Sequence, residues 1–558
     1  MSFTPWGGEK VKFQDKLARR RLLAGSATAA AGVAGLALVG CGGDDDDNGG
    51  SPSATETSTA PGSSATPGDR PAPKGSVTLV IATPIAQIDP FKRLGGQDTA
   101  AIMQMFDSLL YRDPQGGYQP RLATEVKALE GGKVYEFKLR DDVVFHNGDP
   151  MTAEDVKFSF DRILDPNLQV SWKASFATYE SCEIVDNYTV RVHLTEPDGA
   201  FPAVLDPYFF VVPKKYIEQV GNDGFSANPV GTGPFKFVKW DPQIGYEAEA
   251  FTDYWGDVPY VQKLNVRMVT DPQTRLNMLQ SGEADIVEGI PPSHLESVAR
   301  NYKVIRVPNA GNTYVEFNLA TRGPNGLVPR TNTPIADVRV RQAMNHAIDV
   351  KTIIDRVLFG TADQMSAAVA PGVLGYDESL QPYEYNPDKA KQLLSEAGFG
   401  KGDLKIRFNF AIGSETVAQA IADYLAAVGI EVEQVKLETL TLTQGRREAT
   451  LADMFLASFP DYSFDPVTRV PIGFGSKGSY SNVVDEEMDR LLQEVGPVTD
   501  LNERAEIYRK LFKRHFDQAY YIYLWHPQVV YTAKKNVEWE PQPGWAYLRD
   551  ANQIRIVD

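Results

Sequence analysis

The chain has 558 residues, of which 42% are hydrophobic and 10% aromatic, and its formal net charge is -17. This length and composition predict a large globular protein of several modules. The acidic balance argues against nucleic acid or anionic lipid as the main partner and is compatible with cationic or zwitterionic solutes, although solubility alone is the simpler explanation.

Residues 1–40 have the pattern of an export signal. Three arginines at 19–21 precede the uncharged run at 22–39, which fits a twin-arginine type of signal and is only weakly apolar for a membrane helix. Residues 38–41, LVGC, have the form of a lipobox, and in the proteins it resembles the cysteine thiol receives a diacylglycerol. We therefore predict a cleaved signal peptide, by the twin-arginine or the general route, and a lipid on Cys41. This lipid would hold the protein at the extracytoplasmic face of the cell membrane.

The segment at 41–74 contains four consecutive aspartates and then mostly Ser, Thr, Ala, Gly and Pro. A segment of this composition has almost nothing to bury, so it predicts a disordered tether. Such a tether lets a folded part stand away from a membrane while it remains attached.

The sequence contains 2 cysteines. An exported protein with two cysteines normally suggests a disulfide. A lipid on Cys41 leaves Cys182 without a partner, so we predict no intramolecular disulfide and a small, buried, apolar role for Cys182.

The folded part begins with an apolar run at 77–82 that is typical of a buried strand. A stripe at helical spacing follows, which predicts a helix that buries Ile102, Met105, Phe106, Leu109 and Leu110. A strand followed by a helix at this distance indicates an α/β lobe.

Between residues 135 and 163 the sequence predicts an alternating strand, a turn and a capped helix, in that order. Apolar and charged residues alternate over 135–140, which indicates a strand with one buried face. Asn147-Gly148 marks a turn, and Thr152 with Asp155 forms a capping box that begins a helix. One apolar stripe on that helix contains Val156, Phe160, Ile163 and Leu164.

This stretch resembles the signature of the family 5 extracytoplasmic solute-binding proteins of ABC importers, which include the oligopeptide- and dipeptide-binding proteins. Similar stretches follow in the same order at 251–256 (FTDYWG) and 338–349 (VRVRQAMNHAID). The resemblance runs from about Val77 to the end of the chain. It implies an α/β, two-lobed, periplasmic-binding-protein type II-like fold of the large three-domain type, and it makes 135–163 scaffold rather than solute site.

The resemblance also implies that domain I is discontinuous. The expected bounds are 75–111, 229–310 and 515–558 for domain I, 112–228 for domain II, and 311–514 for domain III. Within domain I, Asp271-Pro272 opens a helix that Gly282 closes, between apolar runs at 264–268 and 284–287. This order predicts a βαβ unit and a partly parallel sheet.

Domain III is expected to be a second α/β lobe. Asn386-Pro387 caps a helix that stops at Gly398, an alternating strand follows at 404–410, and 454–457 is an apolar strand. Two further strands, at 520–524 and 529–531, are expected to return to the first lobe, as in the family.

The best candidate solute site is the loop after the strand at 454–457, because ligands of open α/β sheets bind beyond the carboxyl ends of strands. The loop places two carboxylates among three aromatic rings: Phe459, Asp461, Tyr462, Phe464 and Asp465. A carboxylate in a closing cleft suits an ammonium group, and aromatic faces can cover an apolar or cationic substituent.

In peptide binders of the family, an aspartate of this loop pairs with the peptide amino terminus. Asp461 takes that position here, but no tryptophan precedes it in the loop, where Phe459 is the nearest aromatic residue, and the spacing to Asp465-Pro466 is one residue longer than in those relatives. The solute class therefore stays open between a peptide and an oligosaccharide or other solute. The alternative interpretation of both aspartates is that they form turns and cap helices.

Secondary candidates are Asn312 and Tyr314, near a lobe crossover, and Asp89, in the loop after the first strand. No complete nucleotide-binding, nucleophile-elbow or zinc-protease motif is present, so we expect no catalytic residues, no metal and no cofactor.

These observations predict a receptor that captures peptides between its lobes and delivers them to an ABC permease and its ATPase, as a monomer and without nucleic acid. A surface sensor or adhesion lipoprotein is the alternative from another class.

Overall fold

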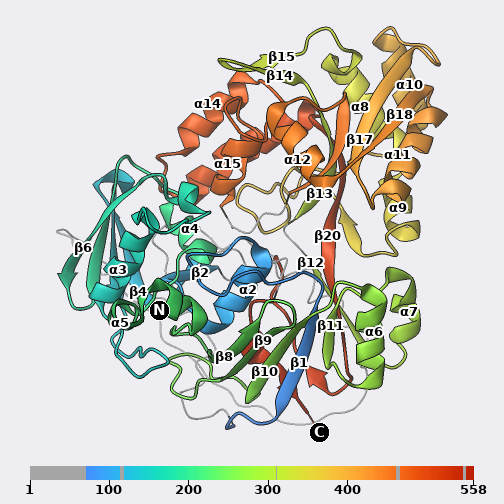
Figure 1. The fold of residues 1–558 in the computed structure, drawn as a ribbon. Coiled ribbons are helices and arrows are strands. Elements are labelled where there is room, and N and C mark those ends of the chain that lie inside the picture. The colour runs from blue at the N-terminus through green and yellow to red at the C-terminus, as the bar shows by residue number, and fades with distance from the viewer. Residues whose placement is uncertain (1–70, 113–117, 309–310, 460–464, 545–547, 558) are drawn as a thin grey trace, which may run out of the picture.

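The computed structural model describes residues 71–112, 118–308, 311–459, 465–544 and 548–557, and they form two lobes (Figure 1). One large core draws its residues from 77–307 and 531–554, and a second core draws them from 314–525. We call residues 71–308 and 526–557 the first lobe and residues 311–525 the second lobe. The expectation of a two-lobed α/β protein is confirmed.

A single 12-stranded mixed sheet runs through both lobes, in the order β18-β17-β19-β13-β20-β11-β1-β10-β9-β8, with β12 and β16 also paired to β20. In the first lobe its strands are β1 (Ser76–Ile81), β8 (Phe235–Asp241), β9 (Gly245–Ala250), β10 (Lys263–Met268), β11 (Ile286–Glu288) and β12 (Lys303–Pro308). In the second lobe they are β13 (Asn312–Phe317), β16 (Ala362–Gln364), β17 (Leu404–Ala411), β18 (Ile430–Leu437) and β19 (Met454–Phe459).

The strand β20 (Tyr521–Ala533) joins the two lobes. It pairs with β13 and β16 in the second lobe and with β11 and β12 in the first. The prediction of two separate strands at 520–524 and 529–531 was wrong on this point. Pro527 lies where β20 changes its partner from β16 to β12, and a proline is tolerated at such a break in a hydrogen-bond ladder.

The predicted βαβ unit is confirmed in the first lobe. β10 and β11 flank β1, both parallel to it, and helix α6 (Pro272–Ser281) connects them. The Asp271 side chain caps this helix by accepting from the Thr274 amide, and Gly282 ends it with a left-handed backbone (φ 84°). Helix α7 (Leu295–Val298) follows before β12.

The first predicted helix is shorter than the apolar stripe suggested. Helix α2 (Gly96–Met105) ends because Phe106 has an extended backbone, and Leu110 already belongs to β2 (Leu110–Arg112), which pairs with β3 (Tyr118–Pro120). The five apolar residues are all buried, but they belong to α2, to the loop after it and to β2.

A four-stranded antiparallel sheet completes the first lobe, in the order β4-β5-β7-β6. Its strands are β4 (Ala123–Leu129), β5 (Val134–Leu139), β6 (Tyr179–Asp186) and β7 (Thr189–Leu194), and helices α3 (Ala153–Leu164), α4 (Phe201–Tyr208) and α5 (Lys214–Ala227) accompany it. The predicted strand and the capping box of Thr152 and Asp155 are confirmed. Leu164, expected in the apolar stripe, is instead 38% exposed at the last position of α3. Cys182 is a buried free thiol, as predicted.

The second lobe packs its helices around the other half of the large sheet (Figure 1). They are α8 (Val338–Ala347), α9 (Val350–Arg356), α10 (Pro387–Glu396), α11 (Glu415–Ala427), α12 (Thr439–Glu448), α13 (Val470–Gly473), α14 (Glu486–Val495) and α15 (Leu501–Asp517). Asn386 caps α10 by accepting from the Lys389 amide, as predicted. Short ribbons β14 (Ala320–Gly323) with β15 (Gly326–Pro329), and β21 (Val537–Glu538) with β22 (Arg555–Ile556), lie outside the main sheet.

Candidate functional site

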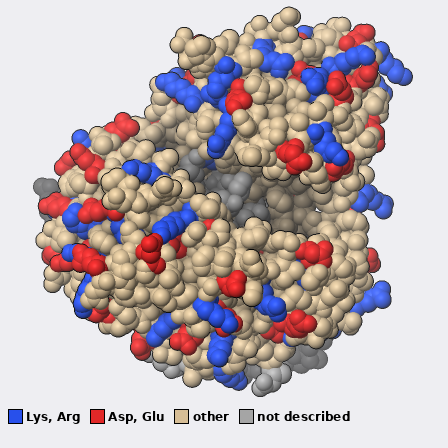
Figure 2. All heavy atoms as spheres, viewed as in Figure 1, with Lys and Arg blue, Asp and Glu red and all other residues tan. Residues whose placement is uncertain are grey.

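A deep hollow separates the two lobes, and most of its visible wall is formed by uncharged residues (Figure 2). The chain crosses between the lobes from β12 to β13 and again along β20, and these strands are neighbours in the sheet. Two adjacent crossings form a hinge about which the lobes can close on a solute.

The candidate loop begins at this hollow. β13 starts directly after the crossover, and its first residue, Asn312, pairs with Phe459, the last residue of β19. The carboxyl end of β19 therefore lies at the boundary between the lobes. The structure brings these two predicted residues together, whereas Asp461, Tyr462 and Phe464, like Cys41, lie outside the described residues.

A buried ion pair fixes the far end of the loop. Arg504 and Asp465 are 0% and 1% exposed, and the Arg504 Nη2 atom lies 2.7 Å from the Asp465 Oδ2 atom. The Tyr508 hydroxyl donates to Oδ1 of the same carboxylate at 2.9 Å, and the Val467 amide donates to it at 3.1 Å. Asp465 also caps the short 3-10 helix Pro466–Thr468. These contacts give Asp465 a structural role, the one foreseen as the alternative.

Asn312 and Tyr314 are fully buried in the second lobe. The Asn312 Nδ2 donates to the Ala368 carbonyl at 2.9 Å. The Tyr314 ring stacks on Tyr521 with centroids 3.8 Å apart, and its hydroxyl accepts from Arg446 at 2.9 Å. Tyr314 is therefore a core residue.

Asp89 belongs to the interior of the first lobe, where it is fully buried. Its carboxylate accepts from the Phe91 amide at 2.9 Å and from the Ser226 hydroxyl at 2.6 Å. These partners place Asp89 in a structural loop, and the structure does not bring it to Phe459.

Sequence reasoning missed Arg469, which follows the candidate loop. Its side chain is 2% exposed, and its guanidinium carbon lies 5.2 Å from the centroid of the Phe459 ring and 5.8 Å from that of Phe474. Its Nη1 and Nη2 atoms have no hydrogen-bond partner among the described residues. An arginine in this segment is visible in the sequence, but its burial is a tertiary property.

The electrostatics around Arg469 keep the neighbouring histidines neutral. Burial, together with the positive charge of Arg469, lowers the pKa of His515 to about 3. Burial also lowers the pKa of His526 to about 4, and Arg469 acts in the same direction. Both rings are therefore uncharged at neutral pH.

The two lobes also touch away from the hinge. The Gly199 amide of the first lobe donates to the Gly496 carbonyl of the second at 3.1 Å. A Cβ atom on Gly199 would lie 1.7 Å from the Val498 carbonyl oxygen, so only a glycine permits this approach. Near the same contact, burial raises the pKa of Asp198 and the positive charge of Arg504 opposes that shift.

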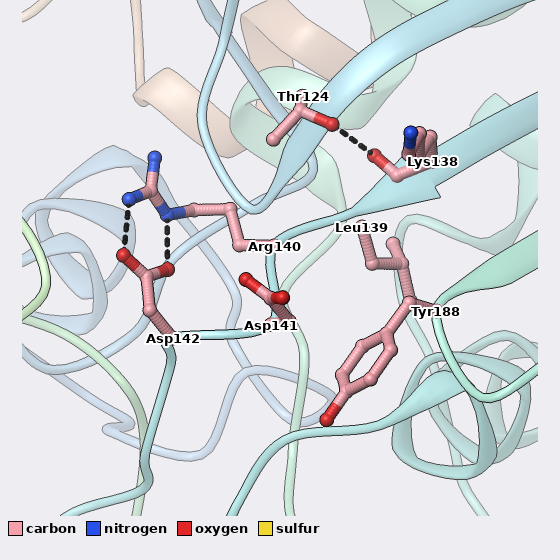
Figure 3. A pocket seen from close by; sticks show the side chains of 7 residues that line it. All are labelled: Thr124, Lys138, Leu139, Arg140, Asp141, Asp142 and Tyr188. Carbon is pink, nitrogen blue, oxygen red and sulfur yellow. Dashed lines mark hydrogen bonds and ion pairs between the residues drawn. The ribbon is translucent and has the colours of Figure 1, made fainter.

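A separate hollow of about 310 Å³ lies on the four-stranded sheet and contains Thr124, Lys138, Leu139, Arg140, Asp141, Asp142 and Tyr188 (Figure 3). Arg140 forms two hydrogen bonds with Asp142, at 2.8 and 2.6 Å. This hollow belongs wholly to the first lobe, so closure of the lobes would not enclose it.

Among the described residues, no group of three or more His, Cys, Asp or Glu side chains is arranged to hold a metal ion. The helices that the structure describes include none with the length and apolar character that a membrane crossing needs.

The hinged two-lobed fold and its cleft define the class of type II periplasmic binding proteins, and solved structures agree. HbpA2 from Haemophilus parasuis superimposes with a TM-score of 0.76 at 24% identity, over 87% of this chain and 100% of that one. DppA from Helicobacter pylori in complex with peptide STSA gives a TM-score of 0.70 at 24% identity, over 87% and 98%.

Residues 117–481 match the family model of the bacterial extracellular solute-binding proteins, family 5, and the chain belongs to this family. It is 29% identical to heme-binding protein A of Haemophilus influenzae over 470 residues, 77% of this chain and 83% of that protein. It is 27% identical to the dipeptide-binding protein of Escherichia coli over 457 residues, 75% and 83%. Proteins of this family are solute receptors of ABC importers rather than enzymes.

Proposed function

We propose that this protein is a lipid-anchored receptor that captures peptides between its lobes and delivers them to an ABC permease. The observation that carries the proposal is the position of Phe459, which ends β19 at the lobe boundary where the candidate loop begins. Solutes of open α/β sheets bind at such strand ends. A closed, solute-loaded state gives the permease a shape to distinguish from the open one.

Within this loop we assign Asp461 to the amino terminus of the peptide. Both ends of the loop are held by the protein itself, at Phe459 through the β13 ladder and at Asp465 through Arg504. An aspartate between these fixed ends offers its charge to an ammonium group in a partly dry cleft. The predicted division into domain I (75–111, 229–310, 515–558), domain II (112–228) and domain III (311–514) is part of the same proposal.

The first experiment is native mass spectrometry of the purified protein, since binding proteins with deep clefts can retain their solute. A retained peptide supports the proposal, and a retained oligosaccharide or other non-peptide solute contradicts the peptide assignment. Calorimetry then compares the wild type with Asp461→Ala. We expect the substitution to weaken the binding of an amino-terminated peptide by about 2 to 5 kcal/mol, the usual effect of leaving one member of a charge pair alone.

The matched control is Asp388→Ala, because the Asp388 side chain is 95% exposed on α10. An N-acetylated peptide is the matched control ligand, since it lacks the ammonium group. If Asp461→Ala binds the free peptide as tightly as the wild type does, Asp461 does not hold the amino terminus.

A further inference from the structure

The second lobe buries Arg446, Arg469 and Arg504 near the candidate loop, and the described residues give a carboxylate partner to the first and the last of them. Arg446 lies 2.7 Å from Glu316, and Arg504 lies 2.7 Å from Asp465, with all four side chains buried. Arg469 is equally buried, yet its Nη1 and Nη2 atoms have no hydrogen-bond partner among the described residues. A guanidinium stays charged in proteins, and taking such a charge out of water costs several kcal/mol unless it is paired.

Glu316 does not serve as the counter-charge of Arg469. The positive charge of Arg469 acts to lower the pKa of Glu316, but the Glu316 carboxylate already lies 2.7 Å from Arg446 and accepts from the side-chain amide of Asn482 at 3.0 Å. Three other titratable groups respond to Arg469, namely His515, His526 and Tyr521, and all three are uncharged at neutral pH. Among the residues that the structure describes, Arg469 therefore has no carboxylate of its own as a partner.

Arg469 lies beside the strand end at the boundary between the lobes. Its guanidinium lies against the Phe459 ring, which ends β19 at the lobe boundary. His526 lies at the same end of the sheet, where its Nδ1 bonds the Gly311 carbonyl at 3.2 Å next to Asn312. The Nδ1 atom must donate in that bond, so the buried Nε2 is an acceptor, and neither it nor the Asn312 Oδ1 has a partner among the described residues.

We propose that Arg469 binds a carboxylate of the solute. The planar guanidinium offers two parallel N–H groups, which match the two oxygens of a carboxylate. The nearby acceptors Asn312 Oδ1 and His526 Nε2 suit an N–H or O–H group on the same solute. This inference rests on the proposed receptor function and narrows the solute to an acidic or zwitterionic molecule, such as a peptide with a free carboxyl terminus.

The experiment compares wild type, Arg469→Met and Arg469→Lys in calorimetry with a peptide acid and its carboxyl-terminal amide. The wild type should prefer the acid. Arg469→Met should bind the acid about 30-fold or more weakly and the amide nearly unchanged, which corresponds to the low end of the loss expected for a buried charge pair. Arg469→Lys should recover part of the acid preference, because lysine keeps the charge but not the fork geometry.

Two controls separate binding from folding. Arg447→Met removes an exposed arginine from the last turn of α12, next to the buried Arg446. It should leave the affinities for the acid and for the amide unchanged. In denaturant unfolding without solute, Arg469→Met should be as stable as the wild type or more stable, whereas Arg504→Met should be less stable because it removes the buried counter-charge of Asp465.

The outcomes distinguish this inference from the proposed function. Peptides that bind equally well as acid and amide overturn the carboxylate site and leave the peptide receptor standing. Acidic sugars that bind through Arg469 while peptides do not would contradict the peptide assignment and support the carboxylate site. A retained solute without an acidic group, or no binding of any acidic probe, overturns the inference.

Discussion

Replacing Gly199 with alanine places a methyl group at the contact between the lobes. Its Cβ would lie 1.7 Å from the Val498 carbonyl oxygen and 2.4 Å from the carbonyl carbon, and both are backbone atoms that no side-chain rotation can move away. Cβ contacts below 3.0 Å essentially never occur, so the Val498 oxygen must retreat by at least the difference between 3.0 and 1.7 Å, which is 1.3 Å. That movement opens the contact.

We expect this contact to belong to the closed, solute-bound arrangement, because it joins the two lobes away from the hinge. Overpacking costs about 1 to 3 kcal/mol, and a lost hydrogen bond between the Gly199 amide and the Gly496 carbonyl adds about 1 kcal/mol. A solute can shift an equilibrium only through its differential affinity for the two states. A penalty of about 2 to 4 kcal/mol on the closed state alone therefore weakens solute binding by about 30-fold to 1000-fold.

The assay is calorimetry with the solute identified by mass spectrometry, together with small-angle X-ray scattering of the free and loaded protein. Gly199→Ala should bind more weakly and keep a larger radius of gyration in the presence of solute. Gly95→Ala is the control, because a Cβ on the exposed Gly95 meets no atom within 4 Å. Wild-type affinity and wild-type scattering for Gly199→Ala would refute the idea that this contact belongs to the solute-bound state.

Two further predictions concern pH and location. In the unfolded chain His515 titrates near its ordinary pKa of 6.5, whereas burial lowers its folded pKa to about 3, so its contribution to stability is lost as pH falls below 6.5. Between pH 7 and pH 5 the wild type should lose about 2 kcal/mol more unfolding free energy than His515→Gln, as measured in urea, and equal losses would contradict the buried neutral histidine. Cys41→Ala should move the protein from the membrane fraction to the soluble fraction of the host cell. A protein that stays in the membrane fraction would exclude a lipid on Cys41 as its anchor.

The sequence correctly predicted the helix starts and ends that depend on residues close to one another in the chain. The capping box of Thr152 and Asp155 begins α3, and Asp271 with Gly282 bounds α6, because each feature depends on residues within a few positions of one another. The buried residues Val340, Ala343, Met344 and Ala347 of α8 recur at helical spacing, which is also a local pattern.

The errors occur where distant contacts override a local pattern. The apolar runs at 520–524 and 529–531 suggested two strands, yet β20 is continuous because β16 and β12 pair with it in turn. The apolar stripe after Ile102 suggested one long helix, yet Leu110 belongs to strand β2, which pairs with β3. Neither partner can be identified from the residues next to them.

The candidate site also combines a feature that local sequence predicts with roles that depend on distant contacts. The loop beyond β19 was found from its position after a strand, but the roles of its residues depend on partners far along the chain. Asp465 lies 39 residues from Arg504 and becomes a buried anchor through it. The burial of Arg469 and the close approach at Gly199 are equally invisible in the sequence, because they arise only when the elements pack.

Arg504 links the candidate loop to the contact between the lobes. Its Nε atom donates to Asp465 at 2.7 Å, and its Nη1 atom donates to the carbonyls of Val495 at 2.8 Å and Val498 at 2.9 Å. The Val498 carbonyl is the group that Gly199 approaches. One buried guanidinium thus holds the end of the loop and the segment that touches the first lobe. Because one side chain holds both groups, we expect a shift of Asp465 on solute binding to reach the contact, and a substitution at Gly199 tests solute binding without altering any group proposed to touch the solute.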